Sequence, residues 1–168
     1  DYYEGQIEAV AELVEAADGQ VLTVVTLYSA FMCSVNTVGA DLVTRHLMED
    51  PEAYCKGLEI ITESLLVFVN ACIDAGVDGF YASTQGREDF RFKDKKLFDD
   101  YIKPYDLLMW EKIDANCDFN ILHVCDYNGK YSDLSPFAEY PGDLVNAPLD
   151  LTTGPLSAEE ANSRFASP

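Results

Sequence analysis

The stretch VLTVVTLY, from Val21 to Tyr28, decides the fold class of this 168-residue chain. It is short, nearly all apolar and rich in β-branched residues, which is typical of a strand covered on both faces in a parallel sheet. Similar stretches follow at Val77–Ala82 (VDGFYA) and Phe119–Val124 (FNILHV), and a weaker one lies at Asp143–Ala147 (DLVNA). We therefore expect four strands that run in the same direction.

Helical patterns separate these strands. Apolar residues at helical spacing, or capping residues, predict helices over Glu4–Ala17, Gly39–Met48, Pro51 to about Gly76, Lys95–Ala115 with a break at Pro104, Leu134–Glu139 and Ser157–Phe165. Alternating strands and helices predict an α/β fold, either an open doubly wound sheet or a (β/α)8 TIM-type barrel. No Gly-x-Gly-x-x-Gly motif follows a strand, so the motif that usually indicates a dinucleotide-binding sheet is missing.

Four strands are only half of an eight-stranded barrel. If the chain folds as a barrel, residues 1–168 form a single partial (β/α)-barrel domain. The other strands then come from further sequence or from a second chain, and a homodimer is one such arrangement. The opening Asp-Tyr-Tyr-Glu has no initiator Met, which also suggests a fragment.

Composition narrows the class of partner. The net charge of -19, from 30 acidic and 11 basic side chains, argues against nucleic-acid binding because it repels phosphate backbones. The longest apolar stretch, Leu65–Ala71, is too short to cross a bilayer, so no membrane span is expected. Five irregularly spaced cysteines without an export signal favour a reducing, cytoplasmic location over a disulfide framework.

His123 and Cys125 end the third predicted strand. Residues i and i+2 of a strand point to the same side, so both side chains aim together at the end where parallel α/β sheets carry their chemistry. An imidazole and a thiolate are two zinc-compatible ligands, and they can also serve as a histidine base with a cysteine nucleophile. The spacing equally allows a core histidine, hydrogen-bonded to backbone, beside a small apolar cysteine.

The loop after the second strand concentrates positive charge. Five of the 11 basic residues fall within ten positions: Arg87, Arg91, Lys93, Lys95 and Lys96. This loop either binds an anionic substrate, with Gln85, Arg87 and Arg91 as contacts, or is a solvated loop whose charges offset nearby acids.

Two single residues complete the candidates. Asp126 directly follows Cys125 and is a candidate acid or base, or a partner that orients a ligand. Asn146 ends the fourth predicted strand and is a candidate hydrogen-bond contact to a ligand.

Several motifs, taken in order, resemble the uroporphyrinogen decarboxylase superfamily. They are AGVDGF at Ala75–Phe80, STQG at Ser83–Gly86, YIKPY at Tyr101–Tyr105, NILHVC at Asn120–Cys125 and YPGDLVN at Tyr140–Asn146. The resemblance runs from about Gly19 to Phe165 and implies a (β/α)8 barrel. It also implies one of two chemistries. The first removes carboxyl groups from a porphyrinogen without a cofactor, and the second transfers methyl from a corrinoid protein to coenzyme M.

Residues that match the motifs divide between these two chemistries. The methyltransferase relatives hold zinc with a His-x-Cys pair and a distant second Cys, and His123 with Cys125 matches that pair; the remaining ligand would lie beyond Pro168. Ser83 resembles the serine that contacts substrate in the decarboxylases. Asn36, however, stands where their tyrosine is expected, and their substrate-protonating segment would precede this chain.

Three functions follow as hypotheses. The first is zinc-dependent methyl transfer involving a tetrapyrrole or corrinoid-linked substrate, with His123 and Cys125 as metal ligands. The second is porphyrinogen decarboxylation, with Ser83 as a substrate-binding residue and the acid supplied by the segment that would precede this chain. Across these readings, Ser83 and Asp126 are the catalytic candidates. The third is a catalytically silent half-barrel that acts by binding or assembly, because half a barrel exposes unpaired strand edges.

Overall fold

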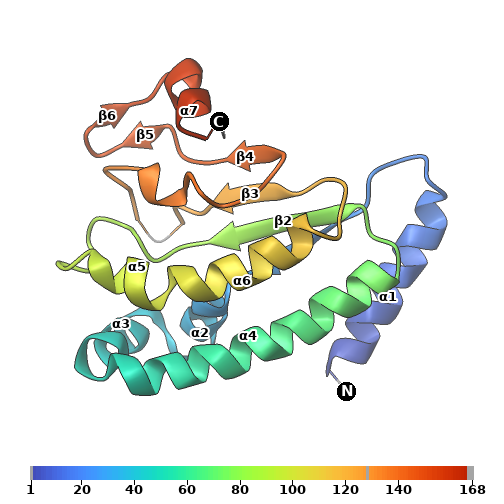
Figure 1. Cartoon of the computed structure of the whole chain (residues 1–168), viewed down its shortest axis with the longest axis horizontal. Coiled ribbons are helices and arrows are strands. Elements are labelled where there is room, and N and C mark those ends of the chain that lie inside the picture. Colours follow the sequence, from blue (N-terminus) through green and yellow to red (C-terminus); the bar gives the residue numbers. More distant parts are fainter. Residues whose placement is uncertain (1, 128, 166–168) are drawn as a thin grey trace.

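The computed structural model describes residues 2–127 and 129–165. It contains one parallel sheet in the order β1-β2-β3-β4 (Figure 1). The strands are β1 (Val24–Tyr28), β2 (Gly79–Thr84), β3 (Ile121–Val124) and β4 (Leu144–Asn146). All three neighbouring pairs are parallel, which confirms the α/β fold predicted from the alternation of strands and helices.

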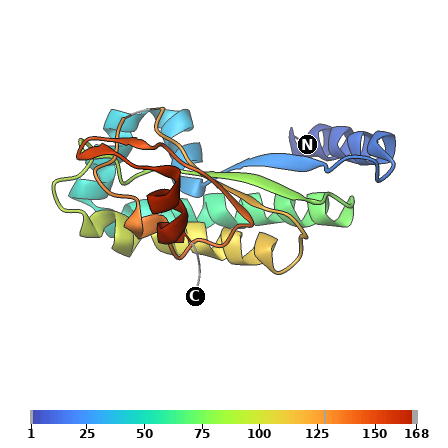
Figure 2. The same ribbon diagram turned by 90° about the horizontal axis from the view of Figure 1, so that it is seen from above.

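Helices follow the strands in the expected order. They are α1 (Tyr2–Ala17), α2 (Ala30–Val38), α3 (Ala40–Glu49), α4 (Pro51–Asp74), α5 (Lys96–Tyr101), α6 (Lys103–Asp114), the short 3-10 helix η1 (Ser135–Phe137) and α7 (Ala158–Phe165). The two-stranded hairpin β5 (Asp150–Leu151) and β6 (Gly154–Pro155) precedes α7. Figures 1 and 2 show α1 at the end of the molecule opposite α3 and this hairpin. In the described part of the chain, no helix has the length and apolarity needed to cross a membrane.

Two local expectations were wrong. The sequence analysis predicted no helix directly after β1, but this segment forms helix α2. The Ser29 hydroxyl caps its first turn by accepting a hydrogen bond from Met32 N at 3.2 Å. Strand β1 is also not covered on both faces. Leu27 is buried against the helices, whereas the side chains of Thr26 and Tyr28 on the other face are exposed.

The hydrophobic core lies on one side of the sheet. Five apolar strand residues that face the helices are fully buried, namely Leu27, Phe80, Ala82, Leu122 and Val124, whereas Val25 and Val145 on the same face are half-buried. They pack against apolar residues of α2, α4 and α6. The alternate residues form what we call the inner face, and they are exposed or half-buried apart from Gly79 and Ser83: Val24, Thr26, Tyr28, Tyr81, Ile121, His123, Leu144 and Asn146.

The register of β2 against β3 is set where the strands begin. A Cβ atom on Gly79 would lie 1.6 Å from the Phe119 carbonyl oxygen, so only glycine permits this approach. The Asn120 side-chain oxygen accepts the Phe80 N–H at 3.0 Å, and the Asp78 carbonyl accepts the Phe119 N–H at 3.1 Å. These contacts hold the two strands together at the end opposite the predicted site.

A buried ion pair shapes the loop after β2. The Glu88 carboxylate accepts two hydrogen bonds of 2.7 Å from the Arg91 guanidinium, and both side chains are 0% exposed. The same carboxylate accepts the Gly86 N–H at 3.0 Å. Opposite charges and backbone donors thus compensate the cost of burying Glu88.

We expect Glu88→Gln to lower the free energy of unfolding by about 3 kcal/mol or more, because it leaves the Arg91 charge buried without a partner. Urea denaturation at neutral pH measures this change. Glu139→Gln is the matched control, since Glu139 pairs with Lys103 but is 65% exposed. That control should cost less than about 1 kcal/mol, and equal losses in the two variants would contradict the prediction.

Candidate functional site

The strand register aligns four side chains across the carboxyl end of the sheet. Tyr28 pairs with Ser83, Ser83 with His123, and His123 with Asn146. We call these four residues the strand-end row. The sequence predicted three of them, and it missed Tyr28. A tyrosine is therefore present at the end of β1, although the sequence comparison had placed Asn36 at the expected tyrosine position.

A cavity of about 340 Å³ opens in front of this row. Its lining brings together four residues predicted from the sequence, namely Ser83, Gln85, His123 and Cys125. Aromatic side chains that the sequence analysis did not select complete its walls: Tyr28, Tyr81 and Tyr127. We call this hollow the strand-end cavity.

The ring of His123 is held in one orientation. Its Nδ1 lies 3.3 Å from the Asn146 carbonyl oxygen, and its ring stacks on Tyr81 at 5.0 Å between centroids. A carbonyl only accepts, so this contact places a proton on Nδ1 and leaves the lone pair of Nε2 to act as base or metal ligand. The Tyr81 hydroxyl donates to Asn146 Oδ1 at 2.9 Å, which keeps Asn146 in place.

Cys125 is fixed by its backbone and contacted at its sulfur. Its N–H donates to the Thr84 carbonyl at 3.0 Å, and its own carbonyl accepts the Tyr131 hydroxyl at 2.7 Å. The Gln85 side-chain amide lies 3.2 Å from Cys125 Sγ and donates to it. A donated N–H is a better partner for a thiolate than for a neutral thiol.

His123 and Cys125 fit a metal as two of its ligands. An imidazole that donates its other N–H to a carbonyl, next to a thiol, is a zinc-compatible donor set. Within residues 2–127 and 129–165, no group of three or more His, Cys, Asp and Glu side chains is suited to hold a metal. The described part of the chain therefore offers two candidate ligands for such a site.

Four predicted residues lie outside this cavity lining, among them Asn146, whose backbone carbonyl contacts His123. Asp126 is exposed, and Arg87 is half-buried on the loop after β2. Arg91 is committed to its buried ion pair with Glu88 and packs over the ring of Phe31. Their assignments as acid or base and as substrate contacts stay predictions, and the placement of Arg91 does not favour its role.

Asp106, on α6, is a buried carboxyl directly behind the strand ends. Its Oδ2 accepts the Thr84 hydroxyl at 2.5 Å and the Tyr140 hydroxyl at 3.0 Å, and the Ser29 hydroxyl also hydrogen-bonds the carboxylate. Burial raises the pKa of Asp106 to about 7, although these hydroxyl bonds act to lower it. The sequence analysis missed Asp106; the available signal was an acid on the same helical stripe as the buried Met109, Trp110 and Ile113.

The model of the uroporphyrinogen decarboxylase (URO-D) family matches residues 3–150. The chain belongs to the uroporphyrinogen decarboxylase family. Among solved structures, a methyltransferase from Methanosarcina mazei is similar to it, with a TM-score of 0.71 and 17% sequence identity. The match covers 95% of this chain and 44% of the methyltransferase, so this chain spans less than half of that protein's length. No curated protein matches the chain.

Membership of the uroporphyrinogen decarboxylase family decides between the two α/β architectures. Its barrel fold and the four parallel strands together confirm the predicted partial (β/α)8 barrel. The inner face of the sheet corresponds to the inside of the barrel, and the strand-end cavity lies at the carboxyl ends of the strands, where barrel enzymes carry their active sites.

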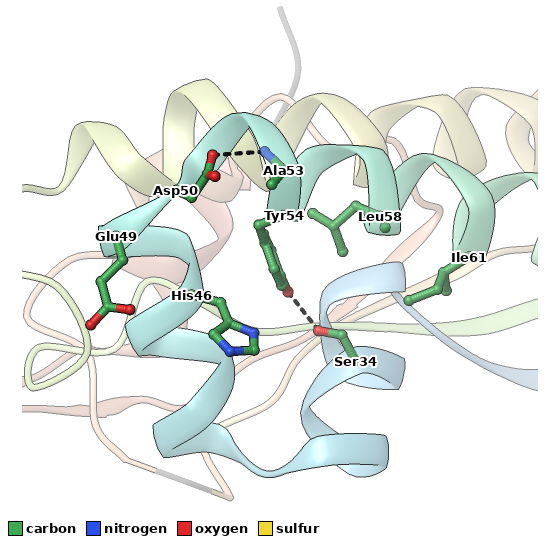
Figure 3. Close-up of a pocket in the computed structure, with 9 residues that line it drawn as sticks. Ser34, His46, Glu49, Asp50, Ala53, Tyr54, Leu58 and Ile61 are labelled. Atoms are coloured by element: carbon green, nitrogen blue, oxygen red, sulfur yellow. Dashed lines mark hydrogen bonds between the residues drawn. The ribbon is translucent and has the colours of Figure 1, made fainter.

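A second hollow, of about 430 Å³, lies among α2, α3 and α4 (Figure 3). The Ser34 and Tyr54 hydroxyls inside it are 2.6 Å apart and satisfy one another. His46, the other histidine of the chain, lies at its exposed edge. This hollow belongs to the helix layer, so we place the chemistry in the strand-end cavity.

The Asp106 carboxyl should make stability depend on pH. Its pKa lies above the ordinary value of 3.8, so its contribution to stability is complete below about pH 4 and is lost as pH rises through 7. We expect Asp106→Asn to remove this loss, which amounts to roughly 4 kcal/mol across that range. Urea denaturation at a series of pH values measures it.

The matched control is Asp114→Asn, at the exposed end of the same helix. It should keep the pH dependence of the unsubstituted protein. A decline with pH that persists unchanged in Asp106→Asn would show that another group causes it.

Proposed function

We propose that the protein is a zinc-dependent thiol methyltransferase of the uroporphyrinogen decarboxylase family. The observation that carries the proposal is the contact between His123 Nδ1 and the Asn146 carbonyl. Metal-binding histidines almost always donate their second ring N–H to such an acceptor, which leaves Nε2 as the ligand. Cys125, two residues further on, provides a thiolate ligand on the same cavity wall.

Zinc bound by His123 and Cys125 would supply Lewis acidity that keeps the substrate thiol deprotonated at neutral pH. The residues of this chain have distinct tasks around it. The Gln85 amide orients the Cys125 sulfur and compensates negative charge on it. Asn146 and Tyr81 fix the direction of the His123 ring.

The walls of the cavity support a large, flat co-substrate. Tyr28 is 45% exposed and Tyr127 is 89% exposed, and both line the cavity together with Tyr81. Aromatic rings offer broad apolar faces on which a corrinoid or another tetrapyrrole can pack. Arg87 is the candidate contact for the carboxylates of such a ring, because its Nε is buried without a hydrogen-bond partner among the described residues.

Decarboxylation of a porphyrinogen is the second candidate. It is favoured by the position of Ser83, which lies between Tyr28 and His123 in the strand-end row. A buried serine beside a tyrosine offers two hydroxyl groups to a substrate carboxylate. Asp126, at the same end of the sheet, is then the candidate acid.

We expect the full-length protein, purified under reducing conditions, to contain about one zinc ion per chain, held by His123, Cys125 and the further ligand that the family resemblance implies. His123→Ala and Cys125→Ser should each lose the metal, since each removes one of these ligands. Mass spectrometry of metal content measures this directly. Cys33→Ser is the control, because Cys33 is a half-buried free thiol on α2 and should leave the zinc content unchanged.

Absence of zinc from the unsubstituted protein would overturn the methyltransferase proposal. Turnover assays then separate the remaining possibilities. Consumption of a porphyrinogen would establish the decarboxylase, and demethylation of methylcobalamin with a thiol would restore the methyltransferase. Activity in either assay would exclude a silent half-barrel.

A further inference from the structure

The Asp106 carboxylate lies on the opposite side of β2 from the strand-end cavity. We propose that Asp106 is a positioning residue for the site: by holding Thr84, it sets the backbone on which Gln85 and Cys125 meet. The inference rests on the proposed function only in taking Cys125 as the functional thiol. It concerns the geometry of that thiol and does not require that a metal be bound.

Successive side chains of β2 point to opposite faces of the sheet, so a contact on the helix side can affect the cavity side. Thr84 points towards the helices and donates to Asp106 Oδ2 at 2.5 Å. Its neighbours Ser83 and Gln85 point the opposite way and line the cavity. A constraint on the Thr84 side chain therefore also orients both cavity residues, because all three share one short length of backbone.

A short series of contacts then leads to the sulfur. The Thr84 carbonyl accepts the Cys125 N–H at 3.0 Å, which ties the loop after β3 to the end of β2. Across this junction the Gln85 amide lies 3.2 Å from Cys125 Sγ. Any shift of Thr84 away from Asp106 moves two of the partners of Cys125, its backbone acceptor and its side-chain donor.

A purely structural role does not account for a carboxyl at this position. Asp106 Oδ1 is buried and has no hydrogen-bond partner among the described residues, and an apolar side chain would avoid that cost. Two titratable groups face Asp106, and burial raises the pKa of both: Tyr54 to about 12 and Tyr140 well above its ordinary value. Both tyrosines are neutral around pH 7. Of these three side chains, Asp106 is therefore the one whose charge changes near that pH.

The test measures the reactivity of Cys125 in metal-free protein. Iodoacetamide alkylation in the presence of EDTA is followed by mass spectrometry, with Cys33 of the same molecule as internal reference. Thr84→Val removes the hydroxyl but keeps the shape of the side chain, whereas Thr84→Ser keeps the hydroxyl. We expect Thr84→Val to slow alkylation of Cys125 by about fivefold, the factor that one net hydrogen bond carries, and Thr84→Ser to retain the original rate.

Tyr140→Phe separates positioning from stability. It removes the other hydroxyl from the same carboxylate oxygen. The Tyr140 hydroxyl also contacts Thr84, but the Thr84 hydroxyl keeps its own hydrogen bond to Asp106 in this variant. We expect it to lower stability as much as Thr84→Val while leaving the Cys125 rate unchanged. Equal slowing in Tyr140→Phe and Thr84→Val, or no slowing in Thr84→Val, would overturn the proposal.

The two proposals fail in different ways. If the protein contains no zinc but Thr84→Val and Thr84→Ser still differ in the rate of Cys125 alkylation, the metal proposal fails and the positioning role of Asp106 stands. If the protein contains zinc but the rate of Cys125 alkylation is the same in both Thr84 variants, the positioning role fails and the metal proposal stands.

Discussion

The carboxylate of Asp106 joins four parts of the chain that are distant in sequence. It accepts hydroxyl hydrogen bonds from Ser29 after β1, Thr84 at the end of β2 and Tyr140 before β4, while its own backbone belongs to α6. In a low-dielectric interior such bonds are strong, and leaving any partner unsatisfied is costly. The strand ends thus have one arrangement in which these hydroxyl groups are paired with the carboxylate. The positions of the residues that line the strand-end cavity depend on this arrangement.

The same sheet presents two chemically different faces. On the helix side, strand residues such as Leu27, Phe80 and Leu122 are buried and form the core. The inner face carries Tyr81 and the strand-end row, which remain at least partly accessible apart from Ser83. A side-chain period of two lets one short strand serve both stability and chemistry. Catalytic candidates could therefore gather on the inner face without disturbing the core.

Local patterns predicted the strands, the long helices and the shared direction of His123 and Cys125, because each depends on periodicity or on neighbours two residues apart. Contacts between residues that are distant in sequence are not indicated by any local pattern. The sequence shows neither that Gln85 reaches the Cys125 sulfur nor that Tyr28 joins the row, since both follow from strand register. Helix α2 was missed because its apolar run follows a strand directly. Arg91 pairs with Glu88, only three residues away in the same loop, and its predicted contact with a substrate stays a prediction.

The glycine that begins β2 has a consequence at the opposite end of the sheet. Gly79 allows the Phe119 carbonyl to approach so closely that β2 and β3 have a single practicable alignment. Insertion of one residue between Gly79 and Ser83 would move each following side chain of β2 to the opposite face of the sheet. Thr84 would then face the cavity, Ser83 would face the helices, and Asp106 would lose its partner. The length of this six-residue strand is therefore part of the chemistry of the site, as much as the identity of its side chains.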